Sequence, residues 1–281
     1  MFMKNRLIII LAVCGLMSCS EWNDDLFRKE IVKLEEDTSL VDGNGQLYNM
    51  SFDFWNKEGS YEYCYGADAT NGQKEIWASA NNSTASLGYP TCVPSRDTVA
   101  VSGPGKTAVK LETRLIDMWG LKKLASGCIF TGQMGLPDFA SMNASLNWGI
   151  PFSRRPKSLE GYAWYQPAVI NEAKAPYENM LGKTDEGHIY VILSDWNSQF
   201  IVDPAKSKFF DKDNDPAVIG YGSITFDHNT NKFEKFTIDI KYFNNRIPKY
   251  VVIVAASSRL GDYFTGGDHS KLFIDEFKFN Y

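Results

Sequence analysis

Phe236-Thr-Ile-Asp-Ile-Lys-Tyr242 decides the fold class of this chain, because apolar and polar side chains alternate along it. Alternation with period two places one face of an extended strand in a core and the other face in water. Val109-Lys-Leu-Glu-Thr-Arg-Leu115 has the same pattern. The continuous apolar runs 190–193 and 250–256 are typical of strands buried on both faces.

Short runs of this kind recur along the chain and are separated by Gly, Pro, Asn and Asp. No stretch of twelve or more residues shows a helical stripe. Many short strands with little helix predict an all-β fold, a jelly-roll β-sandwich of two antiparallel sheets. Composition does not change over 46–281, which predicts a single domain there. The expected strands lie near residues 51, 75, 109, 129, 147, 162, 190, 219, 236, 252 and 275.

Composition excludes several function classes. The chain has 281 residues, 44% of them hydrophobic and 14% aromatic, which excludes a disordered protein. A net charge of -5 gives no basic face for nucleic acid, so we expect no nucleic-acid partner. With three histidines in the chain, we do not expect a zinc centre built from histidine.

The first residues predict export and lipidation. Residues 1–18 contain Lys4, Arg6 and an apolar run too short to span a bilayer, as in a secretory signal. The end of the run resembles a bacterial lipobox, which predicts cleavage before Cys19 and a lipid on its thiol; the alternative is an ordinary signal with an incidental Cys. Residues 19–45 then form a polar tether. Its acidic start resembles surface-exposed lipoproteins, so we expect an outer-membrane or cell-surface location, with membrane contact through the lipid only.

Three cysteines remain after the predicted processing: Cys64, Cys92 and Cys128. The odd count argues against a full disulfide framework. A Cys64–Cys92 bridge and three buried thiols both stay open as interpretations.

Two apparent ligand motifs fail on inspection. Residues 100–107 resemble the end of a phosphate-binding loop, but Ala100 stands where glycine is needed and a strand follows instead of a helix. Residues 211–215 resemble a calcium loop, but Pro216 replaces its glycine and Gly222 replaces its glutamate. We interpret them as a hairpin turn and a solvated acidic turn, with weak divalent binding at the second as the alternative, and we expect no organic cofactor.

Catalytic residues cannot be assigned from the sequence. The three histidines lie beside turn residues and are interpreted as surface or turn positions: His188, His228 and His269. A glycosidase needs two carboxylates roughly 5–10 Å apart. The acids that could be proposed, without a basis for pairing them, are Glu112, Glu172, Asp195 and Asp262.

Several segments, taken in order, resemble one family, the putative carbohydrate metabolism domain of bacterial surface lipoproteins. The resemblance extends over about residues 51–281 and implies a galactose-binding-like jelly roll. It carries over no catalytic residue. The segments are Ser51-Phe-Asp-Phe-Trp55, Ile76-Trp-Ala-Ser-Ala-Asn81, 106–113, 125–132, 151–156, Leu159-Glu-Gly-Tyr162, 250–258, and Gly261-Asp-Tyr-Phe-Thr-Gly266 running into 274–276.

Acids in the first and last strands suggest a metal. Alternation in 271–281 places Asp275 on one strand face with Phe273, Phe277, Phe279 and Tyr281, and a carboxylate there is costly unless paired or bound to metal. Carbohydrate-binding jelly rolls, which this family resembles, often hold a structural calcium between their first and last strands. Asp53 and Asp275 are therefore predicted calcium ligands. The alternative is that an Arg or backbone amides neutralise each carboxylate.

The leading hypothesis for function is a non-catalytic surface lipoprotein that binds an oligosaccharide or polysaccharide, within a glycan-import complex. Aromatic faces stack on sugar rings while polar groups bond the hydroxyls. The alternatives are a glycoside hydrolase or lyase on a β-sandwich, and a structural or adhesion lipoprotein. The predicted glycan-binding residues are Trp77 with Asn81 and Tyr89, Trp196 with Asp195 and Asn197, and Tyr263 with Phe264; the alternative for each tryptophan is the core.

Overall fold

Antiparallel strands make up nearly all regular structure in the computed structural model, which describes residues 41–59, 61–64, 76–118, 120–135 and 144–281. The predicted signal, Cys19 and residues 20–40 of the predicted tether lie outside the described residues. Residues 39–281 form one compact unit, and the turn at 42–46 already belongs to it, because the Tyr281 hydroxyl donates to the Gly45 carbonyl. No helix in the described ranges has the length and apolarity needed to cross a membrane.

The larger of two sheets has nine strands among the described residues. Its order is β13-β9-β8-β17-β12-β14-β16, and β10 and β3 pair with β17 and β8 off this path. Its strands are β3 (Trp77–Ser79), β8 (Cys128–Met134), β9 (Leu146–Trp148), β10 (Ile150–Pro151), β12 (Gly187–Ser194), β13 (Phe200–Val202), β14 (Val218–Phe226), β16 (Lys241–Tyr242) and β17 (Tyr250–Ala256).

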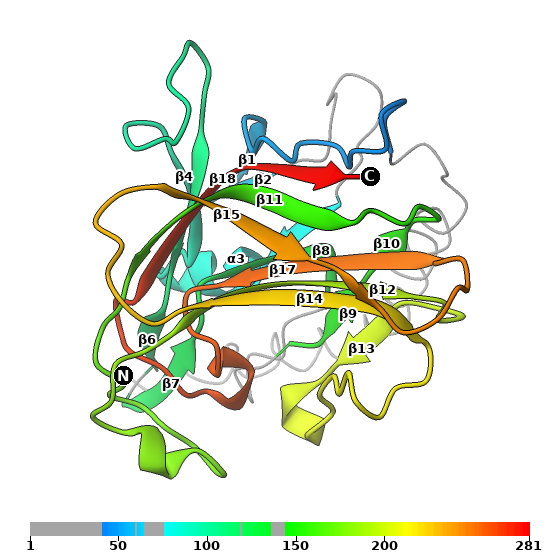
Figure 1. Cartoon of the computed structure of the whole chain (residues 1–281). Helices are drawn as coiled ribbons and strands as arrows, with labels where there is room; N and C mark the ends of the chain where they lie inside the picture. Colours follow the sequence, from blue (N-terminus) through cyan, green and yellow to red (C-terminus); the bar gives the residue numbers. More distant parts are fainter. Residues whose placement is uncertain (1–40, 60, 65–75, 119, 136–143) are drawn as a thin grey trace, which may run out of the picture. The chain divides into compact units, whose positions relative to one another are not determined.

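The smaller sheet has five strands in the order β15-β11-β18-β5-β4, and Figure 1 shows β15, β11 and β18 lying as a layer above β17, β14 and β12. This architecture confirms the predicted β-sandwich. The strands are β4 (Cys92–Ser95), β5 (Ala108–Glu112), β11 (Ser158–Gln166), β15 (Glu234–Asp239) and β18 (Lys271–Asn280). The remaining elements are the hairpins β1 (Trp55–Glu58)–β2 (Tyr61–Cys64) and β6 (Arg114–Met118)–β7 (Leu121–Ala125), the single turn α3 (Asn81–Thr84), and the 3-10 turns η3 (Ala85–Leu87), η4 (Glu178–Met180), η5 (Pro204–Lys206) and η6 (Gly261–Tyr263).

Alternating residues of the two sheets meet in the core. On β12, Ile189, Val191 and Leu193 are fully buried, and Gly187 on the same face lies against the ring of Tyr165 from β11. Tyr165 is itself fully buried and donates its hydroxyl to the Ser257 carbonyl, 3.1 Å away. Burial of such large side chains between the sheets supplies the main stabilisation of the fold.

The far face of the nine-stranded sheet is also covered. Tyr250, Val252 and Val254 of β17 form a second apolar cluster there with Trp148 and Trp196. The strands β12 and β17 are thus buried on both faces, as their continuous apolar runs predict.

The structure corrects three details of the strand pattern. The run near residue 51 is not a strand, since Asn49 and Phe52 have φ of 52° and 59°, yet the segment still lies beside β18 because Phe277 N–H donates to the Met50 carbonyl at 2.7 Å. The expected strand 109–115 is two strands, β5 and β6, which join different sheets. In β18 the aromatic residues do not share one face, because a β-bulge interrupts its pairing with β11.

Candidate functional site

A β-bulge between β11 and β18 shapes one end of the smaller sheet. Glu160 pairs with Lys278 and Tyr162 with Asp275, so Gly161 lies opposite two residues, Glu276 and Phe277. Glu276 takes up the bulge with φ of 50°, a strained value for a residue with a side chain. The extra residue turns Phe277 and Phe279 into the core, while Phe273 and Asp275 stay on the outer face. The expectation that Asp275 shares one strand face with Phe273, Phe277, Phe279 and Tyr281 is therefore wrong.

Gly161 is required by the packing on the inner side of this bulge. A Cβ atom at Gly161 would lie 2.5 Å from the ring of Phe277 and 3.1 Å from that of Phe236. The two rings meet edge to face with their centroids 5.5 Å apart. Glycine thus allows Phe277 to fill the core beneath the bulge.

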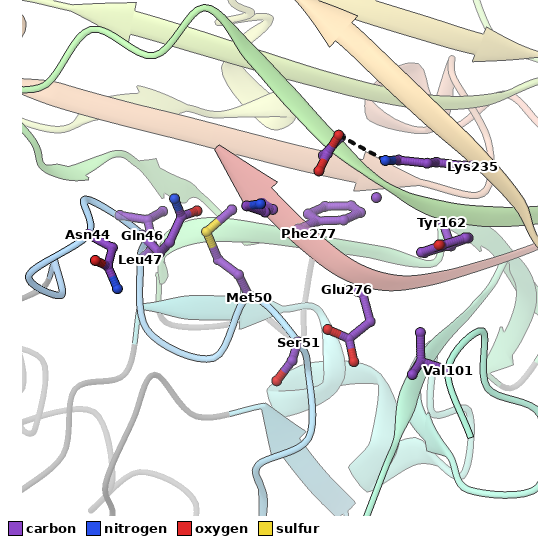
Figure 2. A pocket seen from close by; sticks show the side chains of 13 residues that line it. Asn44, Gln46, Leu47, Met50, Ser51, Val101, Tyr162, Lys235, Glu276 and Phe277 are labelled. Carbon is purple, nitrogen blue, oxygen red and sulfur yellow. Dashed lines mark ion pairs between the residues drawn. The ribbon is translucent and has the colours of Figure 1, made fainter. Parts of the chain in front are cut away.

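A pocket of about 610 Å³ opens over the bulge (Figure 2). Buried Leu47, Met50 and Phe277 contribute an apolar floor, and Tyr162 adds a half-buried ring. The volume lies within the range of roughly 300–1,000 Å³ that is usual for ligand pockets. The polar groups of its lining are Asn44, Gln46, Ser51, Glu160, Lys235, Glu276 and Lys278.

Glu160 is an ionised acceptor on the rim of this pocket. Its carboxylate accepts from Lys235 Nζ at 3.1 Å, shown as the dashed line in Figure 2. That hydrogen bond, helped by Asn280 and the charge of Lys278, lowers the pKa of Glu160. A carboxylate with a lowered pKa accepts hydrogen bonds at neutral pH and is a poor proton donor.

Lys106 joins the pocket to the segment before β1. Its Nζ lies 2.6 Å from Glu276 and 2.8 Å from Asp53, and both carboxylates raise the pKa of Lys106. Asp53 also accepts from the Thr107 N–H at 3.0 Å. Asp275 accepts from the Ala100 N–H at 2.8 Å, and burial is the first cause that raises its pKa to about 6.

These contacts give Asp53 and Asp275 partners other than a metal. Within the described residues, no three His, Cys, Asp or Glu side chains gather as a group that could hold an ion. The alternative to calcium was that an arginine or backbone amides neutralise these two carboxylates. In the structure, Lys106 and backbone amides contact them, so a lysine takes the place of the expected arginine. Calcium binding by Asp53 and Asp275 stays a prediction.

The first predicted glycan-binding group is largely buried. Trp77 is 4% exposed, packs on Phe52 and donates its indole N–H to the Tyr48 carbonyl at 3.1 Å. Asn81 is 1% exposed, and its side-chain Oδ1 accepts from the backbone N–H groups of Thr91 and Cys92 at the start of β4. Trp77 therefore has no free face for a sugar ring. Tyr89 is half-buried beneath the Arg114 guanidinium, 5.6 Å from its ring centroid.

The second group does not form an open aromatic platform either. Trp196 is 8% exposed, donates to Asp215 at 2.7 Å and packs on Phe200, so the expectation that it leaves the core is wrong. Asp195 is paired with Arg246 at 2.7 Å. Exposed Asn197 accepts from Lys249 at 3.2 Å.

Tyr263 and Phe264 keep partial exposure. Tyr263 stacks on Phe209 with centroids 4.2 Å apart and meets Tyr177 edge to face. Lys123 Nζ lies 4.2 Å from the centroid of Phe264. Their role in binding stays a prediction.

Three of the four acids considered for catalysis, Glu112, Glu172 and Asp195, form ion pairs. Glu112 pairs with His269 at 2.7 Å and Glu172 with Lys174 at 2.6 Å, whereas Asp262 has no such partner in the described ranges. His228 is exposed beside Asp227. The sequence neighbours of His188 predicted a turn position, and this is wrong, because His188 lies within β12.

The three cysteines of the domain are free thiols in the structure. Cys64 and Cys92 are buried, and burial raises the pKa of both. Cys128 is partly buried. No bridge joins Cys64 and Cys92, and two of the three thiols are buried as the second interpretation expects.

Sequence reasoning missed the pocket residues. Leu159-Glu-Gly-Tyr162 carried a usable signal, since glycine inside a strand often marks a bulge. The sequence does not single out Lys235 or Lys278, because their proximity to Glu160 depends on strand order.

Comparisons with known proteins agree with this fold. The family model described as "Putative carbohydrate metabolism domain" matches residues 51–280. A protein from Bacteroides thetaiotaomicron, described as a putative glycoside hydrolase, is 21% identical with a TM-score of 0.63 over 82% of this chain and 70% of that one. A second so described, from Bacteroides vulgatus, is 21% identical with a TM-score of 0.60 over 82% and 96%. No curated protein matches the chain.

A carbohydrate-binding module solved with β-1,4-galactotriose is more distant. It is 8% identical with a TM-score of 0.32, over 72% of this chain and 85% of the module. At that distance its ligand carries no argument about this chain.

Proposed function

From the premise that this chain belongs to the family of the putative carbohydrate metabolism domain, we propose that it binds a glycan in the pocket of Figure 2. The family description relates the domain to carbohydrate metabolism. Our proposal goes one step further and states that the chain binds the glycan without catalysing a reaction. The observation that carries it is the composition of the pocket: an apolar floor of Leu47, Met50 and Phe277 beneath a rim of charged and amide side chains.

This composition suits a saccharide. Sugar rings present C–H faces that pack on apolar and aromatic surfaces, and here Tyr162 supplies the aromatic face. Their hydroxyls donate to carboxylates such as Glu160 and accept from amines such as Lys235. Because Glu160 and Lys235 are already paired, their side chains are held in place before a ligand arrives, which lowers the entropic cost of binding.

Binding to a glycan array by full-length protein, followed by titration of a hit, tests the proposal. Tyr162→Ala should weaken affinity about fivefold or more, the equivalent of about 1 kcal/mol for a lost aromatic contact. Phe243→Ala removes an exposed aromatic residue outside the pocket and is the matched control. Equal affinities of Tyr162→Ala and wild-type protein would refute this pocket as the site.

Hydrolysis is the second candidate function, because the rim of the pocket holds two carboxylates, Glu160 and Glu276. Their contacts weigh against it. Glu160 has a lowered pKa and Glu276 is paired with Lys106, whereas a glycosidase needs one carboxyl group that keeps its proton at neutral pH. Reducing-end release from an array-positive glycan, lost in Glu160→Gln, would favour hydrolysis instead.

Attachment at the cell surface through lipidated Cys19 is part of the same proposal and is supported by the signal and lipobox pattern of residues 1–19. A surface site would let the domain hold glycans for an import complex. Cys19→Ala should stay unprocessed or leave the membrane fraction. Normal processing with normal membrane retention would argue against the anchor, and a protein partner without any glycan binding would favour the structural or adhesion alternative.

A further inference from the structure

We propose a second ligand site on the far face of the nine-stranded sheet, where Asp262 binds a hydroxyl group of a neutral saccharide. This site lies on the other sheet from the pocket of Figure 2 and shares no lining residue with it. Binding at this site can therefore be tested separately from binding in the pocket of Figure 2.

A cavity of about 30 Å³ marks the site. Strand β12 contributes His188 and Tyr190, strand β9 contributes Trp148, and the turn η6 contributes Asp262. The volume is close to the share of one water molecule in the liquid, so the cavity accepts a single small polar group. The wall on the η6 side is tightly packed, because a Cβ atom at Gly261 would lie 2.3 Å from Ser126 Cβ.

Asp262 is the unusual group in this cavity. Its carboxylate has no hydrogen-bond or ion-pair partner in the described part of the chain, although burial raises its pKa to about 6. The side chain is partly buried, and leaving a desolvated acceptor without a partner costs up to roughly 1–3 kcal/mol. Such a cost is usual where a ligand supplies the missing hydrogen bond.

Trp148 contributes a hydrogen-bond donor to the same cavity, whereas Asp262 contributes an acceptor. Its side chain is 2% exposed, and its indole Nε1 is a buried donor without a partner among the described residues. The ring lies 5.9 Å from that of Tyr190, so it is held within the cavity wall. A hydroxyl group can donate to a carboxylate and can accept from an indole N–H, so it has the chemistry that both of these lining side chains require.

The surrounding charges favour a neutral ligand over an ammonium group. The Arg259 guanidinium, which pairs with Glu186, lines the same cavity. It would repel a second cation. Burial and the charge of Arg259 lower the pKa of His188 to about 4, so the imidazole is neutral at physiological pH.

The other groups that face Asp262 do not titrate near neutrality. Burial raises the pKa of the Cys128 thiol on β8 to about 12. Burial also raises the pKa of Tyr190, which lies beside Tyr221 of β14. It likewise raises the pKa of Tyr263, which lies on the same turn as Asp262. Between pH 5 and pH 7.5 the charge of the described lining therefore changes at Asp262, whose ionised form is the better acceptor.

Titration of the full-length protein with D-galactose, D-glucose and D-mannose, followed by NMR of the tryptophan indole N–H signals, tests the site. Trp148→Phe identifies the Trp148 signal. We expect at least one sugar, at up to about 50 mM, to shift that signal saturably at pH 7.5. Its affinity should fall about tenfold at pH 5, where a group with a pKa near 6 is about one-tenth ionised.

Two matched substitutions assign the effect. Asp262→Asn should abolish saturation, while Asp213→Asn, which changes an exposed acid that does not line this cavity, should leave it unchanged. Tyr162→Ala should also leave it unchanged, which separates this site from the pocket of Figure 2. No shift with any of the three sugars, binding that survives Asp262→Asn, or a response to D-galactosamine alone would overturn the proposal.

Discussion

Replacing Lys106 with methionine tests whether lysine is the counter-ion that holds the segment before β1 against β18. Methionine keeps most of the apolar stem and removes the charge. The side chains of Asp53 and Glu276 are 17% and 26% exposed and would both lose the cation that lies within 2.8 Å of them. Asp275, whose pKa is raised to about 6, adds a third acid to the cluster.

The magnitude follows from this partial exposure. A surface ion pair contributes about 0–1 kcal/mol, and breaking a buried one costs about 3–5 kcal/mol. Two pairs of intermediate exposure give a loss of about 2 kcal/mol in the free energy of unfolding at pH 7.5. For a domain of this size that lowers Tm by about 4–8 °C.

Thermal unfolding at two pH values checks the reasoning. At about pH 3.5 Asp275, whose pKa is raised to about 6, carries a proton and adds no third negative charge to the cluster, so the gap between wild type and Lys106→Met should shrink. Asp275 adds a pH dependence to both proteins: because its folded pKa is raised, its contribution to stability is full below its unfolded pKa and is lost as pH rises through 6. An equal Tm loss at both pH values would refute the electrostatic account and leave packing of the stem as the cause.

The same samples test the predicted calcium. If calcium bridges Asp53 and Asp275, a chelator lowers the Tm of wild-type protein and Asp275→Asn removes that sensitivity. A wild-type Tm indifferent to chelator, with calcium stabilising Lys106→Met alone, would show that lysine occupies the cation position.

Two further predictions concern single side chains. Trp196→Ala should destabilise the protein by about 3–5 kcal/mol in chemical unfolding, because the indole is buried on Phe200 and bonded to Asp215; retained stability would contradict its place in the apolar cluster. Asp262→Asn should raise Tm at pH 7.5 and leave it nearly unchanged at pH 4. Burial raises the pKa of Asp262 to about 6, so the stability that the protonated side chain contributes is lost as pH rises through that value. After a discount for partial exposure the expected gain in the free energy of unfolding is about 2 kcal/mol, and a loss of stability at pH 7.5 would contradict the prediction.

The sandwich could be predicted because it depends on local periodicity. Alternation in 236–242 and the apolar run 250–256 require no knowledge of neighbouring strands. The run 250–256 became β17, whereas the segment 236–242 became the end of β15 and, after Ile240, the strand β16 of the other sheet. The run near residue 51 failed for the opposite reason. Its apolar residues enter the core from an irregular segment with positive φ at Asn49 and Phe52, and periodicity cannot distinguish this from a strand.

The aromatic candidates show a second limit. Trp196 is followed by polar residues, which suggested a loop mouth, but Phe200 and Phe210 return to cover it. Burial of an aromatic side chain in a loop is decided by contacts distant in sequence. Trp77 was equally ambiguous, and the alternative stated for it, a place in the core, is the one that the structure shows.

Both proposed sites depend on groups whose local environment contradicts what their sequence neighbours suggest. Alternation places Glu276 on the wet face of β18, and the bulge at Gly161 gives it positive φ on the rim of a pocket. Asp262 lies among glycine and aromatic residues, which suggested an exposed loop, and η6 directs it into a cavity without a partner. Strained backbone and unpaired charge cost stability, and sequences that otherwise fold consistently retain such costs mainly where a ligand offsets them. The unpaired carboxylate is therefore the feature whose removal should stabilise the fold and weaken binding together, whereas removal of the bulge would also turn Phe277 and Phe279 out of the core.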